Sequence, residues 1–184
     1  MGLEHQTKGE SVDVFEAVRK RRSIRKFADR PIEGEQLTKI LDAARWAPTA
    51  GNQQRWRFIV VTSPTLKEMV RKISPGIFSR PAAFVVICSL REEELSHWDE
   101  SLLLADCAIA AQNMLLAAYA LGLGSCIALS FSKIALKEIL DIPEHAEPEF
   151  IITLGYANEQ PQPPPRLPLE EIVFAERYGE GWEP

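Results

Sequence analysis

The chain has 184 residues, of which 46% are apolar and 26% are charged, and its formal net charge is −5. This length and composition predict one globular domain with a real hydrophobic core and exclude wholesale disorder. The acidic balance argues against a nucleic-acid-binding protein, because neutralising phosphates needs a basic face. Three isolated cysteines and a polar N-terminus without an apolar leader indicate a cytoplasmic protein.

Helical and extended patterns alternate along the chain. In order, they predict a helix over residues 11–21, a helix over 33–46, a strand over 58–62, a helix over 64–73, a strand over 83–89, a helix over 102–121, a strand over 125–129, a helix over 132–140 and a strand over 150–154. Ser11 is the candidate N-cap of the first helix, and Pro48 ends the second. The strands over 83–89 and 150–154 are continuously apolar, which is typical of strands covered on both faces. The pattern therefore predicts an α+β or α/β domain whose sheet is covered by helices.

The segment 102–121 is apolar except for Asp106, Gln112 and Asn113. It is long enough to cross a bilayer, but Asp106 would be costly in lipid and no second such segment exists, so we expect no membrane span. A helix that is apolar nearly all round is buried in protein. It is either an internal core helix or a helix that lies partly in a subunit interface.

The C-terminal part has a different composition. Residues 160–168 hold five of the 13 prolines and predict an extended segment that joins neither a helix nor a central strand. The residues after it are too few for a second domain, yet several of them, from Leu169 to Trp182, are apolar. They predict an arm laid over its own subunit or over a partner.

Five cations occur among the seven residues 20–26, a local excess in an acidic chain. Arginine forks bind phosphate bidentately, and the hydroxyl of Ser23 adds a donor. Because Arg21, Ser23 and Arg25 alternate, they share one side of an extended segment. The segment is a candidate phosphate site, with a solvated basic helix end or a nucleic-acid patch as the alternatives.

A polar loop separates the second helix from the first strand. Residues 48–54 hold Pro48, the hydroxyl of Thr49, a glycine and three carboxamides. Asn and Gln side chains both donate and accept hydrogen bonds, which suits the mixed edge of a heterocycle. An ordinary polar turn is the alternative.

The sequence contains no motif for a metal site, a hydrolase nucleophile or a nucleotide-binding loop. The three histidines share no metal-ligand spacing, so no metal site is predicted, and neither a nucleophile elbow nor a P-loop lysine motif occurs. Gly122 and Gly124 hint at a nucleotide loop, but they follow a helix, and Ile127 stands where the third glycine would be. The stretch is better explained as a helix C-cap.

Several segments, in this order along the chain, resemble the nitroreductase family of flavoproteins. The matching segments are 21–25 (the family's RRSxR), 47–56 (its APSxxNxQPW loop), 106–114 with 120–124, and 166–171 with Arg177 and Tyr178. The resemblance covers about residues 12–179. It implies an α+β fold, a three-layer sandwich whose central, mostly antiparallel sheet is covered by helices. It also implies a domain-swapped homodimer of one-domain chains (1–184), with 160–184 an extended arm packing on the partner subunit.

The resemblance further implies two flavin mononucleotides (FMN) at the dimer interface. The residues expected to hold FMN are Arg21, Arg22, Ser23, Arg25, Pro48, Thr49, Ala50, Asn52, Gln54, Leu129, Ser130 and Arg166. Residues 21–23 and Arg166 are expected at the phosphate, and Arg25 at the pyrimidine edge, where a cation stabilises the reduced flavin and raises its potential. Residues 48–54 are expected from the other subunit, and the backbone of residues 129–130 beside flavin N5.

The sequence departs from the family pattern at some of these positions. Thr49 replaces the usual serine and keeps the hydroxyl, while Arg55 replaces a proline, loosens the turn and places a cation near the entrance. Pro164 replaces a lysine two residues before the arginine of the arm, which removes one phosphate contact. Leu129 and Ser130 are not the common pair, but a backbone contact with N5 survives that change.

The function that the resemblance implies is that of an FMN-dependent oxidoreductase. NADH or NADPH is expected to pass hydride to flavin N5 and leave, and an electron-poor acceptor such as a nitroaromatic or quinone then takes its place, giving ping-pong kinetics. No side chain is expected to be catalytic. The alternatives are an FMN-storing or sensing module without turnover, a flavin-cleaving or dehalogenating family member, and a dimeric anion-binding scaffold.

Overall fold

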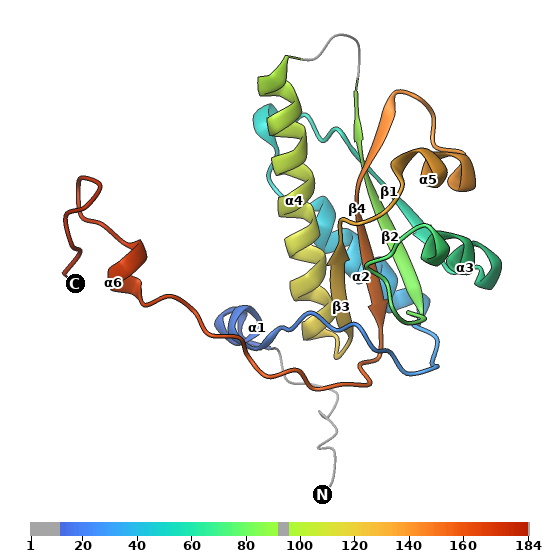
Figure 1. Cartoon of the computed structure of the whole chain (residues 1–184), viewed down its shortest axis with the longest axis horizontal. Helices are drawn as coiled ribbons and strands as arrows, with labels where there is room; N and C mark the ends of the chain where they lie inside the picture. Colours follow the sequence, from blue (N-terminus) through green and yellow to red (C-terminus); the bar gives the residue numbers. More distant parts are fainter. Residues whose placement is uncertain (1–11, 92–95, 184) are drawn as a thin grey trace, which may run out of the picture.

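The computed structural model describes residues 12–91 and 96–183, and a four-stranded sheet lies at its centre (Figure 1). The strands are β1 (Trp56–Val61), β2 (Ala83–Leu90), β3 (Gly124–Ala128) and β4 (Ala146–Gly155). They lie in the order β1-β2-β4-β3, and each neighbouring pair is antiparallel. The predicted antiparallel sheet is therefore confirmed.

Helices cover both faces of this sheet and complete the three predicted layers. One face carries α2 (Gly34–Arg45) and α4 (His97–Ala120), and the other carries α3 (Pro64–Lys72) and α5 (Lys133–Leu140) (Figure 1). α3 begins with Pro64 in its first turn, at the start of the helix predicted over 64–73. The α+β class is thus confirmed.

The central strands supply both hydrophobic cores. Because side chains alternate along a strand, β2 directs Val85 and Ile87 into the core beneath α2 and α4, and Phe84 and Val86 into the core beneath α3 and α5. All four side chains are fully buried. An unbroken apolar run is what a strand covered on both faces requires.

Two strands begin earlier than their apolar runs predict. β1 starts at Trp56, and β4 starts at Ala146, where polar residues precede the apolar run. The pairing of β4 with β2 shifts register between Ile87 and Cys88, which leaves Glu149 as an extra residue in a bulge beside Pro148. Bulges accommodate residues that cannot join the regular ladder, proline among them.

The first helix, α1 (Val14–Lys20), is shorter than predicted and has a different cap. The carboxylate of Asp13 accepts hydrogen bonds from the Phe15 and Glu16 N–H groups at 3.1 and 3.2 Å. Aspartate caps a helix as well as serine does, and it stands closer to the first apolar residues. Ser11, the predicted cap, lies outside the described residues.

The long helix α4 begins before the predicted start because its first turn is polar. Ser96 and Asp99 form a reciprocal capping box there. Its end is as predicted, since Gly122 has a left-handed backbone (φ 72°) and the Leu123 N–H donates to the Ala118 carbonyl at 2.8 Å. α4 has the length and composition of a membrane span, but it packs against α2 and the sheet as a core helix.

The C-terminal arm leaves the body of the chain (Figure 1). Residues 160–168 are extended, as predicted. The arm then forms a single helical turn, α6 (Leu169–Ile172), and a bridge between Phe174 and Gly181, which the sequence pattern does not predict. Tyr178 is 93% exposed and Trp182 is 49% exposed, so these side chains are not buried against the rest of the described chain.

Candidate cofactor site

The basic segment, residues 20–26, is attached to β3, which is an edge strand of the sheet. Ser23 forms a parallel bridge with Ser125, and the Ile24 N–H donates to the Ser125 carbonyl at 2.9 Å. Ile24 is buried against Gly124, where a Cβ would lie 2.8 Å from Ile24 Cγ2. Glycine therefore allows the close approach that holds the segment in place.

Arg21 presents a buried donor that the protein does not satisfy. Its Nε is one of two buried side-chain nitrogen or oxygen atoms, among the described residues, that have no hydrogen-bond partner. Leaving such a group unpaired costs about 1–3 kcal/mol, so native structures seldom do it without a reason. An anion at this position would supply the acceptor.

Arg22 makes contacts of a different kind. Its Nη1 donates to the carbonyls of Arg19 and Arg21, both at 2.7 Å. These bonds cap the end of α1, where the last carbonyls lack intrahelical partners. Arg22 therefore supports the segment and has only its remaining N–H groups to offer an anion.

The structure places Arg25 close to the turn that follows β3. Arg25, Phe78 and Ala128 line one small cavity. The adjoining Gly76 lies against Ser130, since a Cβ on Gly76 would be 3.6 Å from Ser130 Cβ. Leu129, the other predicted residue of this turn, is exposed.

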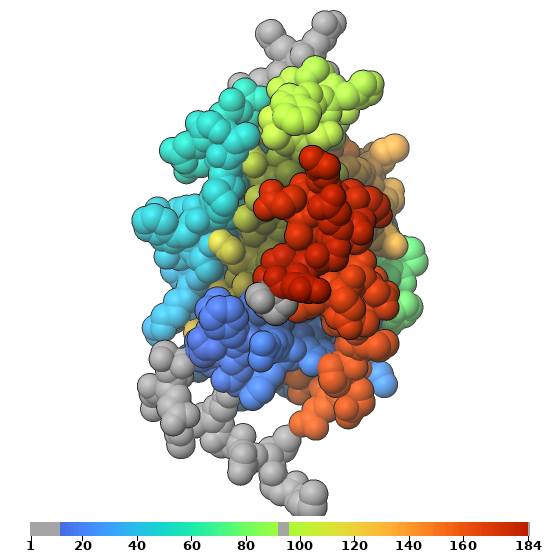
Figure 2. Space-filling model, turned by 90° about the vertical axis from the view of Figure 1, so that its left-hand side faces the viewer, coloured from blue at the N-terminus to red at the C-terminus, as the bar shows by residue number. Residues whose placement is uncertain are grey.

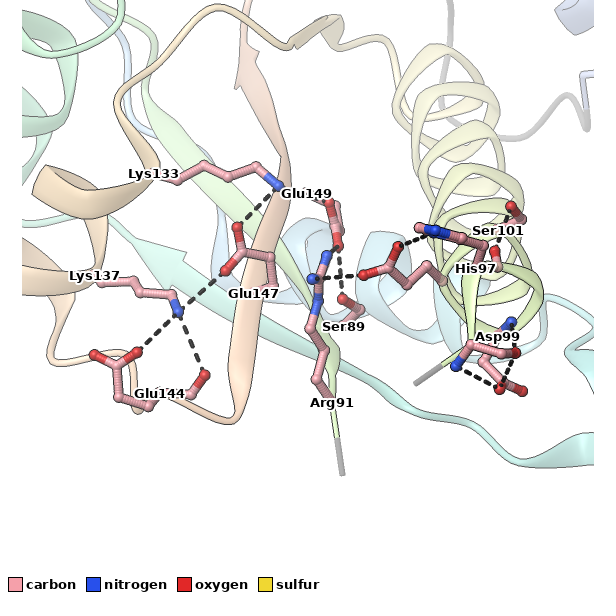
Figure 3. A network of polar contacts seen from close by, with 12 residues as sticks. Ser89, Arg91, His97, Asp99, Ser101, Lys133, Lys137, Glu144, Glu147 and Glu149 are labelled. Atoms are coloured by element: carbon pink, nitrogen blue, oxygen red, sulfur yellow. Dashed lines mark hydrogen bonds and ion pairs between the residues drawn. The ribbon is translucent and has the colours of Figure 1, made fainter. Parts of the chain in front are cut away.

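The turn after β3 leads directly into α5, whose start is held by ion pairs (Figure 3). Lys133 Nζ lies 3.0 Å from a carboxylate oxygen of Glu147 and 3.0 Å from one of Glu149. The buried Glu149 also accepts from the Ser89 hydroxyl at 2.7 Å and contacts Arg91 at 3.3 Å. Burial alone lowers the pKa of Lys133, but the two carboxylates outweigh it and raise that pKa. The ammonium group therefore stays charged and fixes one end of the turn.

The second predicted segment forms a tight loop between α2 and β1. It contains one 3₁₀ turn, Ala50–Asn52, and the backbones of Asn52 and Gln54 are left-handed, with φ of 54° and 52°. The Gln54 N–H donates to the Thr49 hydroxyl at 3.2 Å, and its side chain donates to Asn52 Oδ1 at 3.1 Å. Pro48 is exposed at the start of the loop. Left-handed non-glycine residues are uncommon and cluster at functional sites.

Asp106 anchors this loop to α4. Only 8% of this residue is exposed, and its Oδ1 accepts the Ala50 N–H at 3.2 Å. Satisfying a backbone N–H explains why a carboxylate stands in the largely apolar stretch of α4.

Within one chain, the two halves of the predicted site lie near different parts of α4. The loop meets α4 at Asp106, whereas the basic segment pairs with Ser125, just beyond the C-terminal end of α4 at Ala120. A helix rises about 1.5 Å per residue, so Asp106 and Ala120 are about 20 Å apart along its axis. One copy of the chain therefore does not bring the two segments together.

Arg166 lies on the arm, which passes α1 in both views (Figures 1 and 2). Among the described residues its guanidinium donates only to the neighbouring carbonyls of Pro164 and Pro165, at 3.3 and 3.1 Å. The structure does not join it to the basic segment.

Two residues that support Arg25, Ser79 and Glu159, are not predicted from the sequence. The Ser79 hydroxyl donates to the Arg25 carbonyl at 2.6 Å, and the Glu159 carboxylate accepts the N–H groups of Arg25 and Lys26. The Arg25 N–H holds the pKa of Glu159 below its usual value. Ser79 and Arg25 are 54 positions apart in the sequence, and Glu159 and Arg25 are 134 positions apart. No periodicity in the sequence identifies a polar Ser or Glu as a partner over such separations.

Two of the three cysteines offer the site no reactive thiol, while Cys126 lines the small cavity beside Arg25. Cys88, Cys107 and Cys126 are free and buried. Burial raises the pKa of both Cys88 and Cys107 to about 12, so these two thiols stay protonated and unreactive near neutral pH.

Known sequences resemble this chain over most of its length. The model of the Nitroreductase family matches residues 18–85 and 72–156. A Methanothermobacter thermautotrophicus protein, assigned as an NADH dehydrogenase/NAD(P)H nitroreductase, is 38% identical over 158 residues, covering 82% of this chain and 80% of the relative. An NADH dehydrogenase of Thermus thermophilus is 32% identical over 197 residues, covering 89% and 96%.

Solved structures share the fold. A nitroreductase family protein of Clostridium difficile has a TM-score of 0.81 at 31% identity, covering 90% of this chain and 99% of that chain. The NADPH:FMN oxidoreductase of Vibrio harveyi, solved with NAD⁺, has a TM-score of 0.82 at 27% identity, covering 91% and 78%. With the sequence match, the antiparallel sheet and the matching segments in their expected order, the chain belongs to the nitroreductase family.

Proposed function

We propose that this protein is an FMN-dependent NAD(P)H oxidoreductase whose cofactor sites form between two copies of the chain. Its family membership makes it an oxidoreductase that takes electrons from a reduced nicotinamide. The Vibrio harveyi relative is named for both NADPH and FMN, which supports this choice of cofactors. The observation that carries the proposal is the buried, unpaired Nε of Arg21, a donor that requires an acceptor.

The residues at the β3 edge fit the anionic end of FMN. Arg21 offers its unpaired Nε, Ser23 offers a hydroxyl, and Arg22 offers the N–H groups that do not cap α1. Hydrogen bonds from arginine to phosphate are roughly twice as strong as neutral ones. We propose that Arg166 joins this set from the arm, where it donates only to neighbouring carbonyls.

The flavin ring is assigned to Arg25 and to the turn formed by Leu129 and Ser130. The guanidinium of Arg25 would favour added negative charge on the pyrimidine edge of a bound flavin, and the backbone of the turn would offer it a neutral contact. Bound FMN would supply a two-electron hydride-transfer centre, which amino-acid side chains do not offer. The part of this chain is to bind the cofactor, orient it and tune its affinity for electrons.

The other half of each site is assigned to a second copy. About 20 Å along α4 separates the loop with Pro48, Thr49, Ala50, Asn52 and Gln54 from the basic segment. Apolar side chains are also exposed on α4, where Leu104 is 45% and Ile109 is 41% exposed. Figure 2 shows the arm in front of part of α4. Exposed apolar surface of this kind marks interaction sites. The exposed Tyr178 and Trp182 of the arm would also be buried by a partner.

Both reactants are expected to use one place on the flavin. NADH or NADPH binds and leaves before an electron-poor acceptor, such as a nitroaromatic or a quinone, takes its position. Shared occupancy predicts ping-pong kinetics, which appear as parallel lines in double-reciprocal plots. The unpaired cysteines fit the proposed cytoplasmic location.

The first test is the visible spectrum of the purified protein, before and after anaerobic addition of NADH or NADPH. The proposal expects a flavin band that bleaches with the nicotinamide and returns when a quinone or nitro compound is added. A flavin band that does not bleach would favour a binding module without turnover. A colourless protein that also rejects added FMN would refute the proposal.

A double variant tests the phosphate assignment. Arg21→Ala with Ser23→Ala should lose FMN while the oligomeric state stays that of the wild type. The matched control is Arg80→Ala with Ser63→Ala, which removes the same two groups where the arginine is exposed and the serine makes no capping bond. Equal flavin content in both double variants would refute the assignment.

A further inference from the structure

Arg25 is held by its backbone from two directions. Glu159, which stands directly before the arm, accepts the N–H of Arg25 and, at 2.9 Å, the N–H of Lys26. The neighbouring Asn158 N–H donates to the Lys26 carbonyl at 2.9 Å. From the other side, the Ser79 hydroxyl donates to the Arg25 carbonyl at 2.6 Å. Both polar backbone groups of Arg25 are therefore fixed by long-range contacts.

The side chain of Arg25 is in a different situation. Its guanidinium makes no hydrogen bond or ion pair with the described part of the chain, and the residue borders the small cavity beside the turn after β3. A long side chain that is free at its tip is directed mainly by where its backbone is placed. A carboxylate that accepts two backbone N–H groups is a strong constraint, because bonds to an ionised acceptor are short and strong.

We propose that Glu159 is a positioning residue for the flavin, which fixes the backbone of Arg25 so that the guanidinium meets the pyrimidine edge. The inference rests on the proposed FMN site and adds to it a residue outside the contact set. Glu159 does not touch the cofactor. It acts only through Arg25, and its effect falls on the reduced flavin, because that form carries the charge that the guanidinium stabilises.

The sign of the effect separates positioning from simple charge. Removing a carboxylate near the flavin makes the local potential more positive, which by itself raises the reduction potential. Releasing the backbone of Arg25 moves a cation away from the flavin, which lowers the reduction potential. If Glu159 positions Arg25, the second effect is the larger one.

The experiment compares FMN-loaded wild type with Glu159→Gln by spectroelectrochemical titration. We expect about a tenfold loss in the affinity for reduced relative to oxidised FMN, which corresponds to a potential about 30 mV lower for a two-electron couple. In an Arg25→Ala background the same substitution should no longer lower the potential, so the two changes form a double-mutant cycle. Glu138→Gln is the matched control, since it removes an equal charge from an exposed position on α5.

A second measurement does not depend on the flavin. Hydrogen exchange at the amides of Arg25 and Lys26 should be faster in Glu159→Gln than in wild type, because the neutral amide oxygen of Gln is a weaker acceptor than the ionised carboxylate. A potential that is unchanged or raised in Glu159→Gln overturns the positioning role, and so does an equal drop in the Arg25→Ala background. A wild type that binds no FMN overturns the proposed function itself, and this inference with it.

Discussion

Replacing Gly124 by alanine tests whether the basic segment is positioned by its packing on β3. The added Cβ would meet Ile24 Cγ2 at 2.8 Å and Ile24 Cβ at 2.9 Å. Carbon atoms in contact are ordinarily about 3.5–4.0 Å apart, so the segment would have to move by about 1 Å. The obstacle is the stem of a buried β-branched side chain, which cannot rotate away.

The expected loss of stability follows from two opposing terms. Overpacking a close contact costs about 1–3 kcal/mol. Alanine also restricts the unfolded chain, which stabilises the protein by about 0.4–1 kcal/mol where the backbone allows it. The net expectation is a loss of about 1–2 kcal/mol in the free energy of unfolding. Because Arg21 and Ser23 move with Ile24, we also expect about a tenfold weaker FMN affinity, equivalent to about 1.4 kcal/mol.

The assay is urea unfolding at one fixed protein concentration, with FMN affinity measured on the folded protein. A fixed concentration is needed because association contributes to the stability of any oligomer. Gly34→Ala is the matched control, since Gly34 has no atom within 4 Å of an added Cβ and stands at the start of α2. It should be neutral or slightly stabilising. If Gly124→Ala unfolds like wild type and binds FMN equally well, the packing of Ile24 on β3 does not position the segment.

The remaining predictions concern the loop, the polar network and the arm. Asp106→Ala leaves the Ala50 N–H without its acceptor, so we expect the free energy of unfolding in urea to fall by about 1–3 kcal/mol and FMN to bind more weakly. Asp106→Asn keeps an acceptor and should lose less stability. Equal losses of stability in the two variants would contradict this role of Asp106. Burial alone raises the pKa of Glu147, but Lys133 and Lys137 outweigh it and hold that pKa below the usual 4.5. Glu147 thus stabilises the fold above pH 4.5 and loses this contribution as the pH falls further. The stability difference between wild type and Glu147→Gln, about 1 kcal/mol or less at pH 7, should therefore shrink in acid. A stability difference that does not depend on pH would refute this role of Glu147. Deleting residues 161–184 should shift the light-scattering mass toward that of the monomer, whereas Arg166→Ala should lower FMN affinity and leave the mass unchanged. An unchanged dimer mass after the deletion would show that the arm does not hold two copies together.

Periodicity predicts the fold well wherever the apolar pattern is unbroken. The predicted strand 83–89 differs from β2 only at its last residue, because both faces of β2 are buried and every position reports the same environment. The starts of α4 and β4 are harder to predict. The first turn of α4 is polar because it caps the helix, and Glu149 interrupts the apolar run of β4 because a bulge directs it into a network of charges.

The candidate site is predictable in its residue types and much less so in its contacts. Charge and alternation mark Arg21, Ser23 and Arg25 as a group, but they do not reveal that Arg22 caps α1. Nor do they identify Glu159 as the residue that holds Arg25. Local sequence records what a segment can bind, whereas a contact across more than a hundred residues depends on how the sheet orders its strands.

The composition of α4 and the division of the site have one explanation if two copies associate as proposed. One side of α4 packs on α2 and the sheet, so its apolar side chains there need no partner chain. The exposed Leu104 and Ile109 are the side chains of α4 that a partner chain would cover under this proposal. In an interface with two-fold symmetry, whatever one copy gives to its partner it also receives. The loop at Asp106 of one copy can then meet the basic segment of the other, and the same operation builds a second, identical site. On this proposal, the length of α4 sets the distance between the two halves of the site within one copy, and association of two copies completes each site.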